Sequence, residues 1–191
     1  MEQKTVYFEK PGGEENTART LELAKARADE LGIKTVVVAS TVGATGVKAV
    51  EVFKGYKVVV VTHTDGFAEP NTQELTAANR KIIEAKGGII LTTAHALGGI
   101  QRALAKTMPP PPSSAIGDIV AMSLRMFGQG TKVACEIAAM AADAGLVRTD
   151  GEIVSIGGTG RGADTALVLQ PENVHRFFNI KVKEIICKPR L

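Results

Sequence analysis

The chain has 191 residues, of which 45% are hydrophobic and 23% are charged, and its formal net charge is +3. These proportions are ordinary for a globular protein, and the length suits a sizeable core, so we expect one domain over residues 1–191. Lys and Arg are scattered and only 4% of the residues are aromatic, which argues against a nucleic-acid partner.

Strand and helix patterns alternate along the chain. Residues 5–9 form the first predicted strand, and residues 15–32 form a helix that Asn16 or Thr17 caps and that Gly32 ends. Further strands are predicted at 35–40, 57–63, 87–93, 151–158, 165–171 and 177–189, and further helices at 47–55, 71–86, 98–106, 116–127 and 131–144. This alternation predicts an α/β fold with a mostly parallel sheet and helices on both faces, while the hairpin-linked closing strands predict an antiparallel edge.

The residues between the predicted helices 98–106 and 116–127 include four consecutive prolines at 109–112. Proline fixes φ and removes a backbone donor, so the tract 107–114 is not expected to form regular structure. It serves either as a semi-rigid strap over the site or as a contact in a homo-oligomer, and the sequence does not decide between them.

Sequence features of secreted, metal-binding and membrane proteins are not found. Cys135 and Cys187 lie far apart among apolar residues, which predicts free buried thiols in a reducing compartment and no structural metal. Residues 1–16 lack the apolar core of a signal peptide, and no apolar run is long enough to cross a bilayer. We therefore expect a cytoplasmic protein that has no membrane partner.

Small polar residues and glycines follow several of the predicted buried strands. Ligands bind at the carboxyl ends of parallel strands, where loops and helix N-termini converge, so these residues are candidates for one site. The strand at 35–40 leads into Ser40, Thr41, Gly43, Thr45 and Gly46; the strand at 57–63 into His63, Gly66 and Phe67; the strand at 87–93 into Thr93 and His95; and the strand at 151–158 into Gly157, Gly158, Thr159 and Gly160.

The loop 40–46 has the composition of an anion site. Glycines let backbone N–H groups approach an oxyanion, hydroxyls can donate, and the following helix directs its positive end the same way. A strand-to-helix turn also needs glycine and a hydroxyl cap, which explains one such loop without any ligand. Several neighbouring loops of this kind favour a site for a phosphorylated small molecule.

His63 and His95 are the candidate acid–base residues, since imidazole titrates near neutral pH. They could act as a general base or bind a phosphate or a ring nitrogen, but each could equally cap a strand end by bonding to the backbone. A second candidate anion site is the helix N-terminus formed by Gly128, Gln129 and Gly130, with Lys132 nearby. The alternative there is an exposed Lys132–Glu136 ion pair of little energy.

The known nucleotide motifs are not present. No P-loop pattern occurs, and although residues 158–163 match GxGxxA, the residues after them predict a strand where a dinucleotide site requires a helix. This glycine-rich segment therefore forms either a loop that leans over the ligand or a wide hairpin.

The segments 12–22, 39–46, 62–70, 92–99, 127–146 and 156–166 together resemble the stand-alone proteins, found chiefly in archaea, that are similar to the C-terminal α/β domain of pyruvate kinase. The resemblance implies a three-layer α/β/α fold, flavin mononucleotide (FMN) as a bound ligand and no established reaction. It also implies that Ser40, Thr41, Gly43, Thr45 and Gly46 hold the phosphate. Pyruvate kinase activity is not expected, because its catalytic barrel alone takes about 250 residues.

We therefore expect the carboxyl edge of the sheet to bind a phosphorylated ligand, with FMN as the first candidate. Its phosphate would lie at 40–46 and its planar ring among His63, Phe67, Thr93, His95 and the loop 157–160. Asn16, Thr17, Gly66 and residues 128–130 and 132 complete the predicted ligand contacts. The alternatives are a hydrolase or lyase acting on a sugar phosphate with His63 or His95 as general base, and an effector-sensing regulatory subunit.

Overall fold

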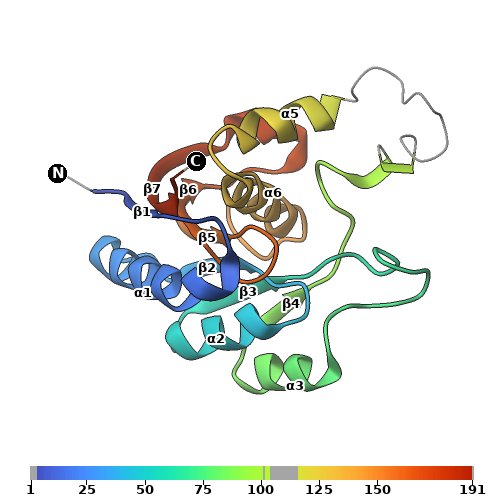
Figure 1. Ribbon diagram of the computed structural model, residues 1–191, viewed down its shortest axis with the longest axis horizontal. Coiled ribbons are helices and arrows are strands. Elements are labelled where there is room, and N and C mark those ends of the chain that lie inside the picture. The colour runs from blue at the N-terminus through green and yellow to red at the C-terminus, as the bar shows by residue number, and fades with distance from the viewer. Residues whose placement is uncertain (1–3, 101, 104–115, 191) are drawn as a thin grey trace.

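The computed structural model describes residues 4–100, 102–103 and 116–190. In this part of the chain, a seven-stranded sheet lies between two layers of helices (Figure 1). The strands are β1 (Val6–Phe8), β2 (Thr35–Ala39), β3 (Lys57–Val61), β4 (Ile89–Leu91), β5 (Ile153–Gly157), β6 (Thr165–Gln170) and β7 (Lys181–Pro189). The helices are α1 (Gly13–Leu31), α2 (Ala44–Val52), α3 (Ala77–Ala85), α5 (Ile116–Arg125), α6 (Gln129–Asp143) and the 3₁₀ helix η1 (Val174–Asn179).

The strand order β1-β7-β6-β5-β2-β3-β4 places the strands that lead into the predicted site next to one another. Strands β5, β2, β3 and β4 are parallel, so their carboxyl ends share one edge of the sheet. Only β6 runs antiparallel to its neighbours β5 and β7 among the described strands. The predicted α/β/α fold, with a mostly parallel sheet and antiparallel pairing among its closing strands, is thus confirmed. The antiparallel strand β6 is not itself the edge strand, because β7 and then β1 lie between it and the edge of the sheet.

Alternate residues of the buried strands pack into two separate cores, one on each face of the sheet. Val36 and Val38 of β2 join the core beneath α1, α2 and α3, whereas Val37 between them joins the core beneath α6. Helix α5 packs on α6 (Figure 1). Both faces of the parallel strands are therefore apolar, which is why their sequences are continuous apolar runs without a polar alternation.

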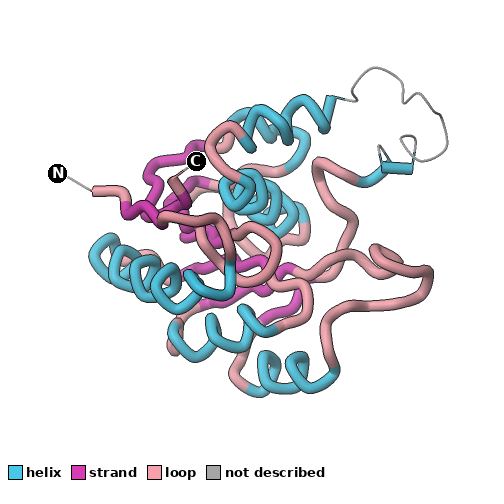
Figure 2. Tube along the Cα trace, in the orientation of Figure 1, coloured by secondary structure: helices cyan, strands magenta, loops and turns pink. Residues whose placement is uncertain are grey.

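Several predicted boundaries differ from the structure. Helix α1 begins at Gly13, so Asn16 and Thr17 are not its caps; they lie in its first turns and their side chains donate to the carbonyls of Gly12 and Gly13. Gly32 does end the helix in the left-handed conformation, as predicted. Helix α3 begins only at Ala77, after the cap Thr76, because residues 62–76 form one long irregular connection from β3 (Figure 2).

The end of the chain and its middle differ too. Residues 174–179 form η1, where the sequence predicted the start of the last strand at 177. Of the helix predicted at 98–106, residues 99, 100, 102 and 103 are helical, and the rest lies outside the described residues together with the proline tract. None of the helices that the structure describes is long and apolar enough to cross a membrane.

Candidate functional site

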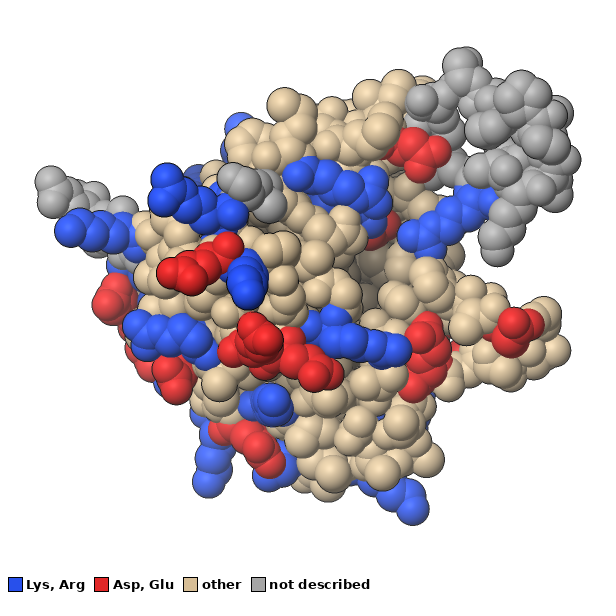
Figure 3. Space-filling view, viewed as in Figure 1, with Lys and Arg blue, Asp and Glu red and all other residues tan. Residues whose placement is uncertain are grey.

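A cavity of about 640 Å³ opens at the shared carboxyl edge of the parallel strands. The loops after β2 and β3, the N-terminal parts of α1, α2 and α6, and the β5–β6 connection all contribute to its wall. Figure 3 shows a hollow on this face of the molecule, with Lys and Arg side chains at its margin. An open, partly charged cavity therefore lies at the edge of the sheet where the sequence predicted the ligand site.

Many of the predicted site residues line this cavity. Those in its wall are Thr17, Ser40, Thr41, Thr45, His63, Phe67, His95, Gln129, Lys132, Gly158 and Gly160. Those outside the wall are Asn16, Gly43, Gly46, Gly66, Thr93, Gly128, Gly130, Gly157 and Thr159. Most residues of the second group are glycines, and the contacts around several of them show that they serve packing.

The β2–α2 loop illustrates this division. Gly43 has a φ of +97°, and a Cβ there would lie 2.5 Å from Asn79 Cβ and 2.6 Å from Leu75 Cδ1. A Cβ at Gly46 would lie 2.8 Å from Val60 Cγ1. These two glycines let α2 approach α3 and β3, and so they place the helix N-terminus at the cavity without forming its wall. Ser40 accepts a hydrogen bond from the Gly46 amide at 3.0 Å.

The first turn of α2 remains available to a ligand. Ala44 and Thr45 line the cavity, and their amides have no acceptor among the described residues. Amides of a first helical turn have no partner within the helix, and the helix dipole adds partial positive charge at this end. This part of the 40–46 loop can therefore donate hydrogen bonds to an anion.

Among the residues that the structure describes, four cationic side chains line the cavity: Lys48, Arg102, Lys132 and Arg161. The carboxylates in the wall are those of Glu14 and Glu136. Sequence reasoning found Lys132 but missed the other three cations. Lys48 could have been found from its position one turn after Thr45 on the same helix face, and Arg161 from its place inside the glycine-rich loop. The excess of cations favours an anionic ligand.

The alternative of an exposed Lys132–Glu136 ion pair is wrong, because the pair is buried. The two side chains are only 5% and 4% exposed, and they contact each other one turn apart on α6. Glu136 also accepts a hydrogen bond from the Leu97 amide at 2.9 Å, which ties α6 to the segment after β4. The pair is buried because α6 packs against the sheet. The periodicity of the sequence alone does not show where the helix packs.

The glycine-rich segment 158–163 forms the connection between the antiparallel strands β5 and β6 and also borders the cavity. The fully buried Asp164 fixes it, since its carboxylate accepts hydrogen bonds from the amides of Gly12 and Thr159. Thr17 accepts another from the Ala163 amide at 2.9 Å. A strand follows the segment, as the sequence predicted when the dinucleotide motif was rejected.

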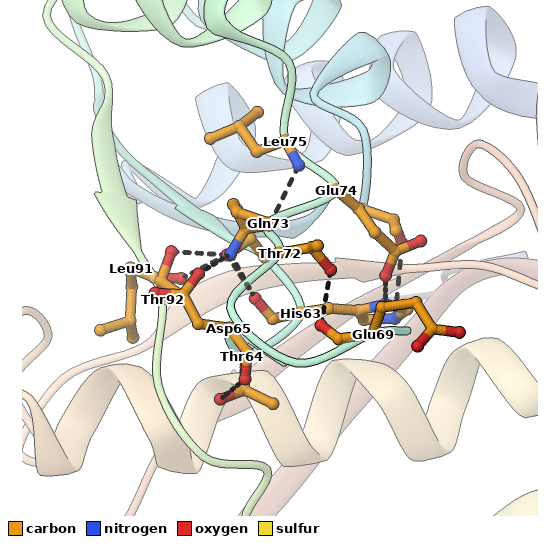
Figure 4. Close-up of polar contacts among 12 residues, drawn as sticks. His63, Thr64, Asp65, Glu69, Thr72, Gln73, Glu74, Leu75, Leu91 and Thr92 are labelled. Atoms are coloured by element: carbon orange, nitrogen blue, oxygen red, sulfur yellow. Dashed lines mark hydrogen bonds and ion pairs between the residues drawn. The ribbon is translucent and has the colours of Figure 1, made fainter. Parts of the chain in front are cut away.

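His63 is held between two side chains. Its Nδ1 lies 2.6 Å from Glu74 Oε2 (Figure 4). Its Nε2 lies 3.4 Å from Thr41 Oγ1. The acidic neighbour in sequence, Asp65, instead accepts a hydrogen bond from Gln73 at 2.9 Å. The carboxylate that orients His63 thus comes from the far end of the long β3–α3 connection, which the sequence assigned to a helix start.

His95 lies in a different environment. Its Nε2 is enclosed and has no hydrogen-bond partner among the described residues. Burial lowers the pKa of His95 to about 4, against an opposing effect of Glu136. The ring centroids of Phe67 and His95 lie 5.4 Å apart in a stacked arrangement, and those of Phe67 and His63 lie 3.9 Å apart. The two histidines and Phe67 therefore form one aromatic group at the cavity.

The lowered pKa of His95 predicts a contribution to acid sensitivity. Between about pH 6.5 and pH 4 an unfolded histidine binds a proton while folded His95 stays neutral, so the folded state loses stability as the pH falls. We expect His95→Gln to lose less unfolding free energy between pH 7 and pH 4.5 than the parent, measured by urea denaturation at both pH values. The exposed His175→Gln is the matched control. An unchanged pH dependence in His95→Gln would contradict the assignment.

The two cysteines are not activated as nucleophiles. Cys135 and Cys187 are free and buried, and burial raises the pKa of Cys135 to about 12, which keeps it protonated. In the described ranges, no three His, Cys, Asp or Glu side chains gather closely enough to hold a metal ion. The polar chemistry of the cavity therefore centres on its cations, its hydroxyls and the two histidines.

Comparison with known families agrees with this architecture. The chain matches the family described as pyruvate kinase, alpha/beta domain, over residues 18–169. The match includes the parallel strands β2–β5, the loop 40–46, the β3–α3 connection and the glycine-rich segment before β6. It confirms the resemblance to the pyruvate kinase C-terminal domain that the sequence motifs predicted. The chain belongs to the pyruvate kinase alpha/beta domain family.

Proposed function

We propose that the cavity at the carboxyl edge binds a phosphorylated small molecule, with FMN as the first candidate. The observation that carries this proposal is the meeting of the α2 N-terminus with Lys48 and Arg161 in one cavity wall. Helix N-termini and cationic side chains stabilise phosphate together, because both compensate its charge and donate hydrogen bonds. The volume of about 640 Å³ also lies in the usual range for small-molecule sites, about 300–1,000 Å³.

The residues present fit the two parts of FMN. The amides of Ala44 and Thr45, with Lys48 and Arg161, would hold the phosphate. The aromatic group of His63, Phe67 and His95 offers a stacking surface for a planar ring. In the described part of the chain, the enclosed His95 Nε2 has no hydrogen-bond partner, and a ligand would supply one. When bound, the flavin would supply redox chemistry, while the protein would bind and orient it.

Titration of FMN with the protein, followed by quenching of flavin fluorescence, tests this function. We expect Lys48→Gln and Arg161→Gln each to weaken FMN binding by about tenfold or more, since a hydrogen bond to a charged group contributes about 1.5–3 kcal/mol. Lys54→Gln is the matched control, because Lys54 is exposed in the turn that follows the C-terminal end of α2 and lies outside the cavity wall.

Riboflavin, which lacks the phosphate, is the matched ligand. We expect it to bind more weakly than FMN to the parent protein and to be insensitive to Lys48→Gln. Equal binding of FMN to all variants, or equal binding of FMN and riboflavin, would show that the α2 N-terminus does not hold the phosphate. If the protein binds inorganic phosphate but not FMN, then FMN is ruled out as the ligand, whereas the proposed phosphate site is supported.

A second candidate function is hydrolysis or elimination on a sugar phosphate, with His63 as general base. The contact of 2.6 Å between Glu74 and His63 favours it, because a carboxylate orients imidazole in the same way in many acid–base sites.

We also propose a cytoplasmic location for the protein. The two free, buried cysteines are in keeping with this reducing compartment.

A further inference from the structure

Thr41, His63 and Glu74 form a continuous chain of contacts at the cavity. Glu74 Oε2 contacts His63 Nδ1 at 2.6 Å, and His63 Nε2 contacts Thr41 Oγ1 at 3.4 Å. The three residues come from different segments, and Thr41 lies in the loop after β2. His63 lies in the loop after β3, and Glu74 lies in the connection before α3 (Figure 4). Hydroxyl, imidazole and carboxylate in this order are the elements of an activated nucleophile.

The carboxylate determines which imidazole nitrogen faces Thr41 as a base. An ionised carboxylate only accepts hydrogen bonds, so in the neutral ring Nδ1 carries the hydrogen and donates to Glu74. The lone pair of Nε2 is then directed toward Thr41 Oγ1, where it can accept the hydroxyl proton. The separation of 3.4 Å is longer than the usual range of about 2.6–3.2 Å, and catalytic contacts commonly tighten when a ligand is bound.

The surroundings of Thr41 indicate what its hydroxyl would attack. Thr41 lines the cavity together with Ala44 and Thr45, whose amides form the first turn of α2. The proposed phosphate would therefore lie beside Thr41 Oγ1, with Lys48 and Arg161 in the same wall. Hydrogen-bond donors and cations around a phosphoryl group stabilise the charge of its transfer, which makes phosphorus the electrophile that this geometry suits.

We propose that Thr41 is a nucleophile for phosphoryl transfer, that His63 is its general base, and that Glu74 positions His63. The inference rests on the proposed phosphate site and extends it from binding to reaction. The substrate class is an acyl phosphate, because its carboxylate leaves as a stable anion and requires no proton. An alkyl phosphate such as FMN would have to expel an alkoxide, so it can bind at the site without reacting.

The transfer step is balanced without a further reactant. Thr41 Oγ1 forms a bond to phosphorus as the bond between phosphorus and the acyl oxygen breaks, and the carboxylate leaves with that electron pair. The hydroxyl proton of Thr41 passes to His63 Nε2. Water then attacks the phosphorus of the phosphothreonine, and protonated His63 gives its proton to Thr41 Oγ1, so that threonine leaves as the alcohol and not as an alkoxide. Inorganic phosphate departs with both hydrogens of the water, and His63 returns to its neutral form.

Acetyl phosphate is the probe that tests this site. After incubation and acid quenching, we expect mass spectrometry to find one phosphoryl group on Thr41, or, if hydrolysis is fast, release of inorganic phosphate. Thr41→Val should abolish both, and Thr41→Ser should keep one of them. His63→Gly should slow the reaction by about 10²–10⁴-fold, and added imidazole should restore part of the rate.

Two measurements separate the possible failures. If the parent neither gains a phosphoryl group nor releases more phosphate than Thr41→Val, but still binds FMN or inorganic phosphate, the reaction proposal is overturned and the binding site stands. If neither ligand binds, the proposed function itself is wrong. Glu74→Gln should slow the reaction in the parent and cost nothing further in His63→Gly; an equal loss in both backgrounds would refute its positioning role.

Discussion

Gly162→Ala is expected to lower the free energy of unfolding by about 2–5 kcal/mol. Gly162 has a φ of +82°, a conformation that costs an L-residue about 1–2 kcal/mol, and overpacking typically adds about 1–3 kcal/mol. A Cβ there would lie 2.2 Å from the carbonyl carbon of Gly13 and 2.4 Å from Thr17 Oγ1. Because backbone atoms of α1 are in the way, the glycine-rich segment would have to leave α1, and the hydrogen bond from the Ala163 amide to Thr17 would be lost.

Gly160→Ala separates the two causes. Gly160 lies in the same segment with a φ of +72°, but a Cβ there would meet no atom within 4 Å. Only the backbone term of about 1–2 kcal/mol should remain. Urea denaturation of both variants measures the difference, and equal destabilisation would contradict the close approach of the segment to α1.

Lys132→Met is expected to destabilise the fold by about 3–5 kcal/mol. Removal of one partner from a buried ion pair leaves the other charge buried and uncompensated, which is far more costly than the loss of an exposed pair. Here the remaining charge would be Glu136, whose side chain is 4% exposed and whose hydrogen bond to the Leu97 amide would persist. The double variant Lys132→Met/Glu136→Gln, which removes both charges, should recover part of the loss.

The exposed pair Arg80–Glu84 provides the matched comparison. It has the same spacing on α3, but its side chains are 41% and 53% exposed. Arg80→Met should therefore cost only about 0.5 kcal/mol or less. Chemical denaturation at neutral pH measures all four proteins, and similar losses for Lys132→Met and Arg80→Met would show that burial does not govern the α6 pair.

The sequence predicted the elements best where burial leaves a clear pattern. The valine runs of β2 and β3 identified strands covered on both faces, since two apolar layers require apolar residues at every position. The boundaries of α1 and α3 were missed because hydroxyl and amide side chains cap turns as readily as helices. Thr17 therefore looked like a cap, although it actually lies in the first turns of α1 and accepts from the Ala163 amide.

The candidate site shows the same limits. The sequence predicted that the ends of β2, β3, β4 and β5 share an edge, and the cavity lies there. It did not distinguish glycines that border a ligand site from glycines that let two elements approach. Gly158 and Gly160 line the cavity, whereas Gly43 and Gly46 make room for side chains of α3 and β3. That distinction depends on which atoms face each Cα in space.

The sequence by itself determined the α/β class, the family and the edge of the sheet where polar residues gather, because these follow from periodicity and local motifs. Only the tertiary structure decided which of those residues act on one another. Glu74 contacts His63 across eleven positions of chain, and Leu97 and Glu136 meet across thirty-nine. The cations Lys48 and Arg161 reach the same cavity from α2 and from the β5–β6 connection. Local sequence patterns predict the conformation of each segment. Contacts between distant segments form only when the helices pack on the sheet, so local patterns do not predict them.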